Sequence, residues 1–276
     1  MKTRALATRV LVTWVYLVAV QAMLGMLITS PTPPPENAGP WFLLSNFLVA
    51  LVLCLLAMRS DWGGARLAVA VSGIPAIIML TNYLEGIIFL TGVTIDWPKE
   101  VLRTCLVSVL TLPLWPLLFR KPGTSQNNFR PLAGRTVKER LWRFVLADLA
   151  YPVLYFMAGV LVFPFVRDFY ATQTIPPVGL VFALQLVVRG PIYVGVCLVM
   201  TRMLGLARLP GAAAVGAAFA TLNGIAPLII PSGVFPEPVR WAHFIEVTIS
   251  NLIFGLIVVW LWGPPNGVKQ MVRQAA

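Results

Sequence analysis

The sequence predicts an all-α fold, a bundle of about eight helices that cross a membrane, and three observations support this. Hydrophobic residues make up 58% of the 276 residues and charged residues only 11%, whereas ordinary soluble domains are roughly one quarter charged. The mean hydropathy is +0.83. Apolar segments of spanning length recur along the chain, and basic residues are concentrated in alternate connections. We therefore expect an integral membrane protein in contact with the lipid bilayer.

The first four predicted spans lie at about residues 10–29, 41–58, 67–92 and 101–119. A spanning helix needs about 20 mostly apolar residues. The first span has a basic start, as a signal peptide has, but its apolar run is long and SPTPPPE follows without a small-x-small cleavage pattern. We expect it to remain as a helix, followed by a stiff connection rich in proline. Pro75, Pro113 and Pro116 are expected to kink the third and fourth helices.

The last four predicted spans lie at about residues 144–166, 177–201, 210–230 and 241–262. In the sixth helix, Gly190 and Pro191 follow Arg189 directly. This pattern predicts a break near the midplane, as in the discontinuous helices of transporters. The seventh helix is rich in glycine and alanine from Gly211 to Ala220. Such a thin helix lets a neighbouring helix approach closely.

The distribution of Lys and Arg predicts the orientation of the spans. Of the 21 basic residues, 16 lie at the two termini or in connections on the same side of the membrane as the termini. Four lie on the other side of the membrane. The remaining one, Arg189, lies inside the sixth helix. Because basic residues are enriched in cytoplasmic loops, we expect both termini in the cytoplasm. The localisation predicted is the cell membrane, which in a bacterium is the inner membrane.

The chain is expected to form a single transmembrane domain, residues 1–276, with two halves of four helices. Residues 1–120 form the first half, 121–143 a basic cytoplasmic loop and 144–276 the second half. A tandem repeat is possible in this arrangement, because CLLAMR (Cys54–Arg59) resembles CLVMTR (Cys197–Arg202). Asn82 and Asn223 fall in corresponding stretches, 141 residues apart. Repeats of four helices would be parallel, related by an axis along the membrane normal.

Several function classes are excluded or left without support. The net charge of +11 would suggest nucleic acid in a soluble protein, but no basic face with interleaved aromatic residues lies outside the spans. Cys54, Cys105 and Cys197 all lie in apolar stretches, which implies no disulfide framework. A single histidine, His243, excludes a bis-His haem and a His-rich zinc site. The sequence contains no nucleotide-binding, nucleophile-elbow or zinc-protease motif, so we predict no cofactor and no metal.

Polar side chains inside the predicted spans are the best indicators of function. An ionisable group near the bilayer centre costs about 2.5–3.5 kcal/mol on the insertion scale, and such groups commonly mark substrate or ion pathways. The ionisable residues are Glu85, Asp148, Arg189, His243 and Glu246, and the amides are Asn46, Asn82, Asn223 and Asn251. Polar residues also join membrane helices to one another. A purely structural role in joining helices is therefore the alternative for each of these polar residues. For the asparagines this structural role is the favoured interpretation.

The rise of ~1.5 Å per residue gives each of these groups a depth. Arg189 lies ~18 Å into its helix, near the midplane, whereas Glu85 and Glu246 lie ~10 Å and ~8 Å from the outer ends of theirs. The long arginine side chain can therefore reach either carboxylate. His243 and Glu246 share a helix face, because they are three residues apart. Asp148 is expected only about one turn inside the cytoplasmic end of its helix.

These depths predict an outward-facing polar cavity that has Arg189 as its floor. Glu85, Glu246 and His243 are expected in its walls, and Asn82 lies on the same face of the third helix as Glu85. Asn251 is expected about 140° around the last helix from the face of Glu246. The predicted substrate-binding residues are Arg189, Glu85, Glu246, His243, Asn82 and Asn251.

Three stretches of the second half resemble a family of uncharacterised bacterial multi-pass membrane proteins. The last helix carries V-R-W-A-H-F-I-E-V-T-I-S-N-L-I-F-G from Val239 to Gly255. Tyr151–Gly159 matches Y-x-x-x-Y-F-x-x-G, and Gln185–Gly190 matches Q-x-x-x-R-G. The resemblance implies that a set of residues belongs together, namely Arg189, Arg240, His243, Glu246, Ser250 and Asn251. It implies no activity.

The leading prediction is the binding or transport of a small polar or amphipathic solute, anionic or a lipid headgroup among the options, in the outward-facing cavity. His243 and the carboxylates are able to carry protons in such a site. One rival is a membrane-embedded enzyme acting on a lipid-linked substrate, with Glu246 and His243 as its acid–base pair. Another is a structural membrane subunit. The sequence leaves the substrate and the oligomeric state open.

Overall fold

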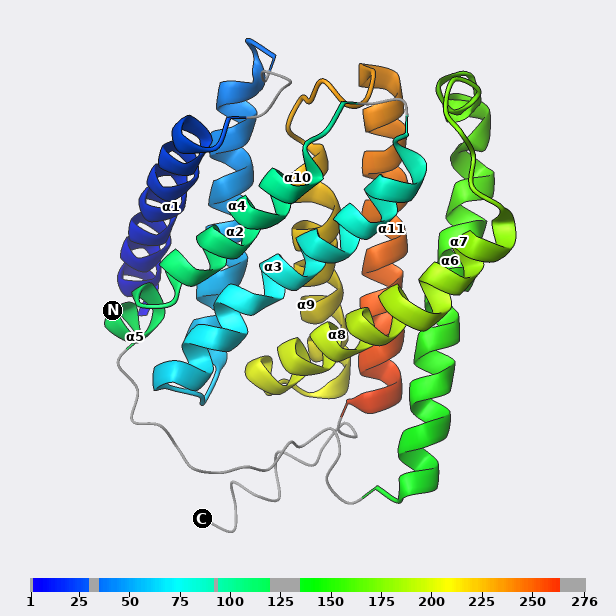
Figure 1. The fold of residues 1–276 in the computed structure, drawn as a ribbon. Helices are drawn as coiled ribbons and strands as arrows, with labels where there is room; N and C mark the ends of the chain where they lie inside the picture. The colour runs from blue at the N-terminus through cyan, green and yellow to red at the C-terminus, as the bar shows by residue number, and fades with distance from the viewer. Residues whose placement is uncertain (1, 30–34, 92–93, 120–134, 264–276) are drawn as a thin grey trace.

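The structure of the chain is a computed structural model that describes residues 2–29, 35–91, 94–119 and 135–263 (Figure 1). In these residues every regular secondary-structure element is a helix, and there is no strand. Within the described residues, eight helical segments are long and apolar enough to cross a membrane. The predicted all-α, multi-pass membrane bundle is confirmed.

The first half contains α1 (Lys2–Leu27), α2 (Ala38–Arg59) and α3 (Gly64–Phe89), followed by the shorter helices α4 (Trp97–Thr111) and α5 (Leu114–Leu118). Pro113 separates α4 from α5, because its ring prevents a regular continuation of the helix. The helix α4 begins after Asp96, whose carboxylate accepts a hydrogen bond from the Lys99 amide at 3.2 Å. The side-chain hydrogen bond with Lys99 lowers the pKa of this partly exposed carboxyl group.

The second half contains α6 (Val137–Tyr170), α7 (Val178–Ala183), the π-helical segment η1 (Leu184–Arg189) and α8 (Gly190–Leu204). It continues with α9 (Arg208–Ala220), the π-helical segment η2 (Thr221–Ile225), α10 (Ala226–Leu228) and α11 (Glu237–Trp262). The segments α7–η1–α8 form one span, and α9–η2–α10 form another.

The helix α6 begins seven residues earlier than the sequence suggested. Thr136 caps it, because its hydroxyl accepts a hydrogen bond from the Glu139 amide while the Glu139 carboxylate accepts one from the Thr136 amide. Residues 137–143 of the predicted loop 121–143 are therefore helical. Residues 120–134 lie outside the described part of the chain, as do Pro31, Pro33 and Pro34 of the predicted proline-rich connection.

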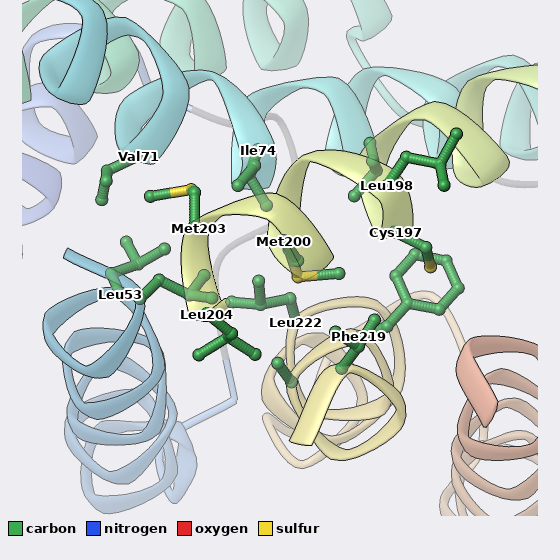
Figure 2. Close-up of a cluster of buried hydrophobic side chains, with 14 of the residues drawn as sticks. Leu53, Val71, Ile74, Cys197, Leu198, Met200, Met203, Leu204, Phe219 and Leu222 are labelled. Atoms are coloured by element: carbon green, nitrogen blue, oxygen red, sulfur yellow. The ribbon is translucent and has the colours of Figure 1, made fainter. Parts of the chain in front are cut away.

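The start of α1 and the end of α11 lie on one side of the bundle, which we call the terminal face (Figure 1). The connection from α10 to α11 lies on the other side, the opposite face. The helices α2, α3, α8 and α9 contribute most of the core. Figure 2 shows Leu53 of α2, Val71 and Ile74 of α3, and Met200 and Met203 of α8 packed together. The outer side of α6 is apolar and exposed, as lipid contact requires.

The helices α9 and α11 pack closely because glycines face each other between them. A Cβ atom on Gly255 would lie 2.6 Å from the Gly216 Cα atom, which is too close for any side chain. Close helix approach through small residues is typical of membrane bundles. The predicted close approach of a neighbour to the seventh helix is confirmed.

Candidate functional site

A cavity of about 960 Å³ lies between the two halves and extends to the connections at the opposite face. Its walls come mainly from α1, α3, α4, α6, η1, η2 and α11 and from residues 230–235, with smaller parts from α2 and α10. The structure brings the six residues predicted from the sequence to this one cavity, where all of them line the wall: Asn82, Glu85, Arg189, His243, Glu246 and Asn251.

Arg189 lies at the closed end of the cavity with its guanidinium group almost fully buried. It forms an ion pair with Glu85 of α3. Its Nη2 atom donates to Asn82 Oδ1 at 3.0 Å and to the Tyr193 hydroxyl at 3.1 Å, and Nη1 donates to Gln185 Oε1 at 3.2 Å. The predicted pairing of Arg189 with one of two carboxylates is thus met by Glu85.

A wider hydrogen-bond network holds these partners in place and joins the halves. The Asn82 amide donates to Asn223 Oδ1 at 2.9 Å, and the Tyr193 hydroxyl donates to Asn82 Oδ1 at 2.8 Å. The Gln185 amide donates to Glu85 Oε1 at 3.3 Å. Gln185 and Tyr193 were not among the predicted residues. They lie four residues before and four residues after Arg189, which places all three on one helix face. This spacing could have identified both residues from the sequence.

Two π-helical segments contribute side chains to this network, η1 with Gln185 and Arg189 and η2 with Asn223. In η1 the Gly190 amide bonds to the Gln185 carbonyl, and in η2 the Ala226 amide bonds to the Thr221 carbonyl. Each segment ends two residues before a proline, which has no amide to continue a regular helix. The predicted break at Gly190-Pro191 is wrong in form, because the helix continues through a π turn. Such turns often occur at functional sites.

A second hydrogen-bonded group lies on the cavity wall nearer the opposite face. His243 Nδ1 lies 2.8 Å from Glu246 Oε2, and His243 Nε2 lies 3.0 Å from the Tyr170 hydroxyl. An ionised carboxylate only accepts hydrogen bonds, so with Glu246 ionised His243 Nδ1 donates to it and a neutral His243 accepts from Tyr170. Tyr170 is the last residue of α6, and no sequence pattern pointed to it.

Charged residues near the mouth of the cavity were not among the predicted substrate-binding residues, although the family resemblance included Arg240. Arg103 Nη1 lies 3.2 Å from both oxygens of the Glu100 carboxylate. Arg240 Nη1 donates to the carbonyls of Leu228 and Ile229 at 3.0 and 3.1 Å. The described lining thus carries three arginines, Arg103, Arg189 and Arg240, and three glutamates, Glu85, Glu100 and Glu246. The wall is therefore balanced in formal charge when His243 is neutral.

Below Arg189, toward the terminal face, four aromatic side chains form what we call the aromatic floor: Tyr151, Tyr193, Phe219 and Phe254. The Arg189 guanidinium lies 5.5 Å from the ring of Tyr151 and 5.3 Å from that of Tyr193. Neighbouring rings of the floor lie 5.0–5.8 Å apart between centroids. All four residues are buried. The floor separates the cavity from the terminal face.

Asp148 is deeper than the sequence suggested and does not line the cavity. It lies 11 residues after the start of α6, a distance of ~16 Å along the helix. A Cβ atom on Gly190 would collide with its carboxylate. The prediction of a position one turn inside the helix end is wrong, because α6 extends further toward the terminal face. Asn46 bonds to Gln21 at 2.8 Å, as expected for a residue that joins helices.

Asn251 is buried and lines the cavity together with Ser250, although it was predicted to lie about 140° from the face of Glu246. The cavity therefore extends around α11. Among the described residues, no group of three His, Cys, Asp or Glu side chains is placed to hold a metal ion.

Comparison with known proteins adds no relative to this picture. No protein-family model matches the chain, and no match is found among curated proteins or among solved structures.

Proposed function

We propose that the chain binds a small polar solute in the cavity and moves it across the membrane. The observation that carries the proposal is the Arg189–Glu85 pair at the closed end of a cavity of about 960 Å³ inside the membrane spans. That volume falls within the ~300–1,000 Å³ of typical small-molecule sites. Intramembrane charges are costly and commonly mark a substrate pathway.

The wall favours a solute whose own charge is balanced, that is, a zwitterion or a neutral polar molecule. Arg189 and Arg103 each have a carboxylate partner, and the formal charges of the lining cancel. An anion would have to compete with Glu85 for Arg189. A zwitterion would instead place opposite charges against both members of a pair. The proposal also covers an amphipathic solute, or a lipid, whose polar part or headgroup has balanced charge.

Transport would require the aromatic floor to open toward the terminal face. The two π-helical segments adjoin the floor, because Tyr193 lies four residues after η1 and Phe219 lies two residues before η2. Their weaker, longer hydrogen-bond pattern provides a place where the helices can change shape. Alternating access in many transporters takes place between structural repeats around a central site.

The two halves are, in this proposal, parallel repeats of four helices. Asn82 and Asn223, which correspond in the sequence alignment of the halves, bond to each other at 2.9 Å. Residues at corresponding positions meet in this way where a twofold axis passes between them. The contacts support the same relation, since α2 meets α8 and α3 meets η2 between the halves. The contacts within each half also correspond. In the first half α1 contacts α2 and α3 contacts α4, and in the second half α6 contacts α8 and α9 contacts α11.

The orientation follows from the charge distribution. The terminal face would be cytoplasmic, because it carries most of the basic residues. The cavity would then extend to the outside of the cell membrane. Cysteine labelling at Gln126, in the basic loop, tests this orientation. Labelling of intact cells by a reagent that does not cross membranes would contradict it.

The second candidate function is an enzyme acting on a lipid-linked substrate, which the Tyr170–His243–Glu246 group favours. A carboxylate that orients a histidine, which in turn contacts a hydroxyl, is an arrangement suited to acid–base work. An enzyme would need this group for turnover but would not need the floor to open. Retained activity when the floor is locked by a disulfide would favour the enzyme over the transporter.

The test of solute binding uses the purified protein in detergent with four solute classes: zwitterionic amino acids, small carboxylates, phosphate monoesters and neutral sugars. A bound solute raises the melting temperature, because it binds only the folded state. We expect the amino acids or sugars to raise it in the wild type and not in Arg189→Gln. Arg202→Gln is the matched control, since Arg202 is equally buried and paired with Asp61 at 2.9 Å but does not line the cavity.

A shift that persists unchanged in Arg189→Gln would contradict the proposed site. A larger shift with carboxylates or phosphate esters would contradict the balanced charge of the solute while leaving the site in place. The absence of any shift with all four classes would argue against solute binding and for the structural role of the ion pair.

A further inference from the structure

A second hollow lies on the outer side of the bundle and shares no lining residue with the cavity. It is a groove of about 900 Å³ between α3 and α8, which we call the α3–α8 groove. Its lining is almost wholly apolar. A Cβ atom on Gly73 or on Gly195, both in the groove, would meet no atom within 4 Å. The groove is therefore open space that the described residues of the chain do not fill.

One end of the α3–α8 groove carries an exposed cation. Arg66 is the third residue of α3, and its guanidinium lies 4.2 Å from the centroid of the Trp62 ring. Among the ion pairs of the described residues, none involves Arg66. The nearby carboxylate of Asp61 binds Arg202 through both oxygens, at 2.9 and 3.0 Å. The groove thus ends at a guanidinium that is free to bind an anion.

The start of α3 adds hydrogen-bond donors at the same end. Gly63 caps the helix and has no side chain to accept from its first amides. Such amides at a helix N-terminus, together with the helix dipole, favour a phosphate group. This position alone would not define a site. It lies beside Arg66, however, so cation and amides point to the same ligand group.

The length of the groove matches one leaflet of a bilayer. Ile77 lies 11 residues beyond Arg66 along α3, a rise of ~16 Å at ~1.5 Å per residue. This is about half of the ~30 Å hydrocarbon core. At the far end, Pro191 follows the buried Arg189 by two residues. The groove therefore extends from the terminal face, where Arg66 lies, to the middle of the membrane.

We propose that the α3–α8 groove is a binding site for an anionic phospholipid of the leaflet at the terminal face. The phosphate would bind Arg66 and the first amides of α3, and an acyl chain would lie along Gly73 and Gly195. A cation beside aromatic and apolar surface at the membrane boundary is complementary to an anionic headgroup with its chain. The site is independent of the solute cavity, because the two share no residue.

The test is native mass spectrometry of the purified protein with phosphatidylglycerol or phosphatidylcholine of identical acyl chains. We expect the wild type to retain the anionic lipid about fivefold more than the neutral one, which is the effect of one arginine at a lipid surface. Arg66→Gln should remove this preference. Gly195→Leu should reduce binding of both lipids, because its side chain would extend into the groove from a position where an added Cβ atom meets no other atom.

Two control variants separate this site from general lipid contact. Arg59→Gln removes an exposed charge at the end of α2 outside the groove, and Gly179→Leu adds an apolar side chain at another open position. Both should bind lipid as the wild type does. Melting temperatures establish that the variants are folded, and Gly73→Leu replaces Gly195→Leu if that variant is not.

Three results would overturn the proposal. Equal retention of the two lipids by the wild type would show that Arg66 does not favour the anionic lipid over the neutral one. Equal losses in Arg59→Gln and Arg66→Gln would show unspecific attraction to a basic surface. A dimer mass that disappears in Gly195→Leu would show that a second copy of the chain occupies the groove.

Discussion

Arg189 and Glu85 form an ion pair across the interface between the two halves, and the two charges are unequally buried. The Arg189 side chain is 5% exposed, whereas the Glu85 side chain is 23% exposed to the cavity. A guanidinium group does not lose its proton in a protein, but a carboxylate can gain one. Removing one partner should therefore have a different effect from removing the other.

The first prediction is that Glu85→Gln destabilises the protein more than Arg189→Gln does. Loss of Glu85 leaves a buried guanidinium without a counter-charge, at a cost of about 3–5 kcal/mol. Loss of Arg189 leaves a carboxylate that faces the cavity and can be protonated. The double variant should be more stable than Glu85→Gln alone. Thermal unfolding of all four proteins in the same detergent measures these differences.

Equal losses in the two single variants would contradict the unequal burial. A double variant whose loss equals the sum of the single losses would show that the two residues do not interact, since independent sites are additive.

The second prediction concerns the contact of α9 with α11. Gly255→Ala should lower the melting temperature strongly, because its Cβ atom would lie 2.6 Å from the Gly216 Cα atom and backbone cannot move aside cheaply. Gly195→Ala should be neutral or slightly stabilising, since the site is open and alanine favours helix by roughly 0.5–1 kcal/mol. A Gly255→Ala variant as stable as Gly195→Ala would show that the helices are further apart than described.

The third prediction tests the seal made by the aromatic floor. Phe219→Ala removes a buried ring, at a cost of about 3–5 kcal/mol, and leaves a void beside Tyr193. Cys197 lies in the same buried cluster, one turn beyond Tyr193 (Figure 2). With Cys54 and Cys105 replaced by alanine, a water-soluble thiol reagent should label Cys197 faster in Phe219→Ala. Phe163→Ala, at an exposed position on α6, is the control.

Unchanged labelling of Cys197 in a folded Phe219→Ala variant would mean that the ring does not seal the path. Rapid labelling of Cys197 in the protein that retains Phe219 would mean that the floor is already open.

The fourth prediction concerns pH. Histidine is the side chain whose charge normally changes between about pH 5 and pH 8. Protonation of His243 would add a cation beside Glu246 and remove the acceptor for Tyr170. The solute-induced change in melting temperature should therefore vary with pH in the wild type and be independent of pH in His243→Gln. Asp168→Asn, at an exposed carboxylate two residues before Tyr170, should retain the variation. A variation that survives in His243→Gln would assign it to another group.

The sequence predicted the fold because apolar segments of spanning length are long, separate signals. It also predicted that Arg189 pairs with Glu85 or Glu246, because isolated charges in apolar helices need partners and the depth of each residue limits the choice to these two. Asp148 was misplaced since the polar first turns of α6 do not resemble a span. The start of α6 at Val137 depends on the Thr136–Glu139 cap rather than on hydrophobicity.

The remaining site residues depend on how the helices are rotated against one another. Tyr170 meets His243 only because α6 and α11 pack side by side, and no spacing within either helix records that contact. The π turns were not predicted either. Pro191 marked an irregularity, but whether a helix breaks or widens there is decided by the neighbouring helices.

The most direct measurement of the central claim is the labelling of two neighbouring residues of α11 in a cysteine-free background. Ser250 lines the cavity, whereas Ile249 is exposed on the outer side of the bundle at the same depth. A charged thiol reagent reacts only where water reaches. We predict rapid labelling of Ser250→Cys in membranes, slow labelling of Ile249→Cys, and protection of Ser250→Cys by any solute that raises the melting temperature. Equal, slow labelling at both positions would contradict a water-accessible cavity between the two halves.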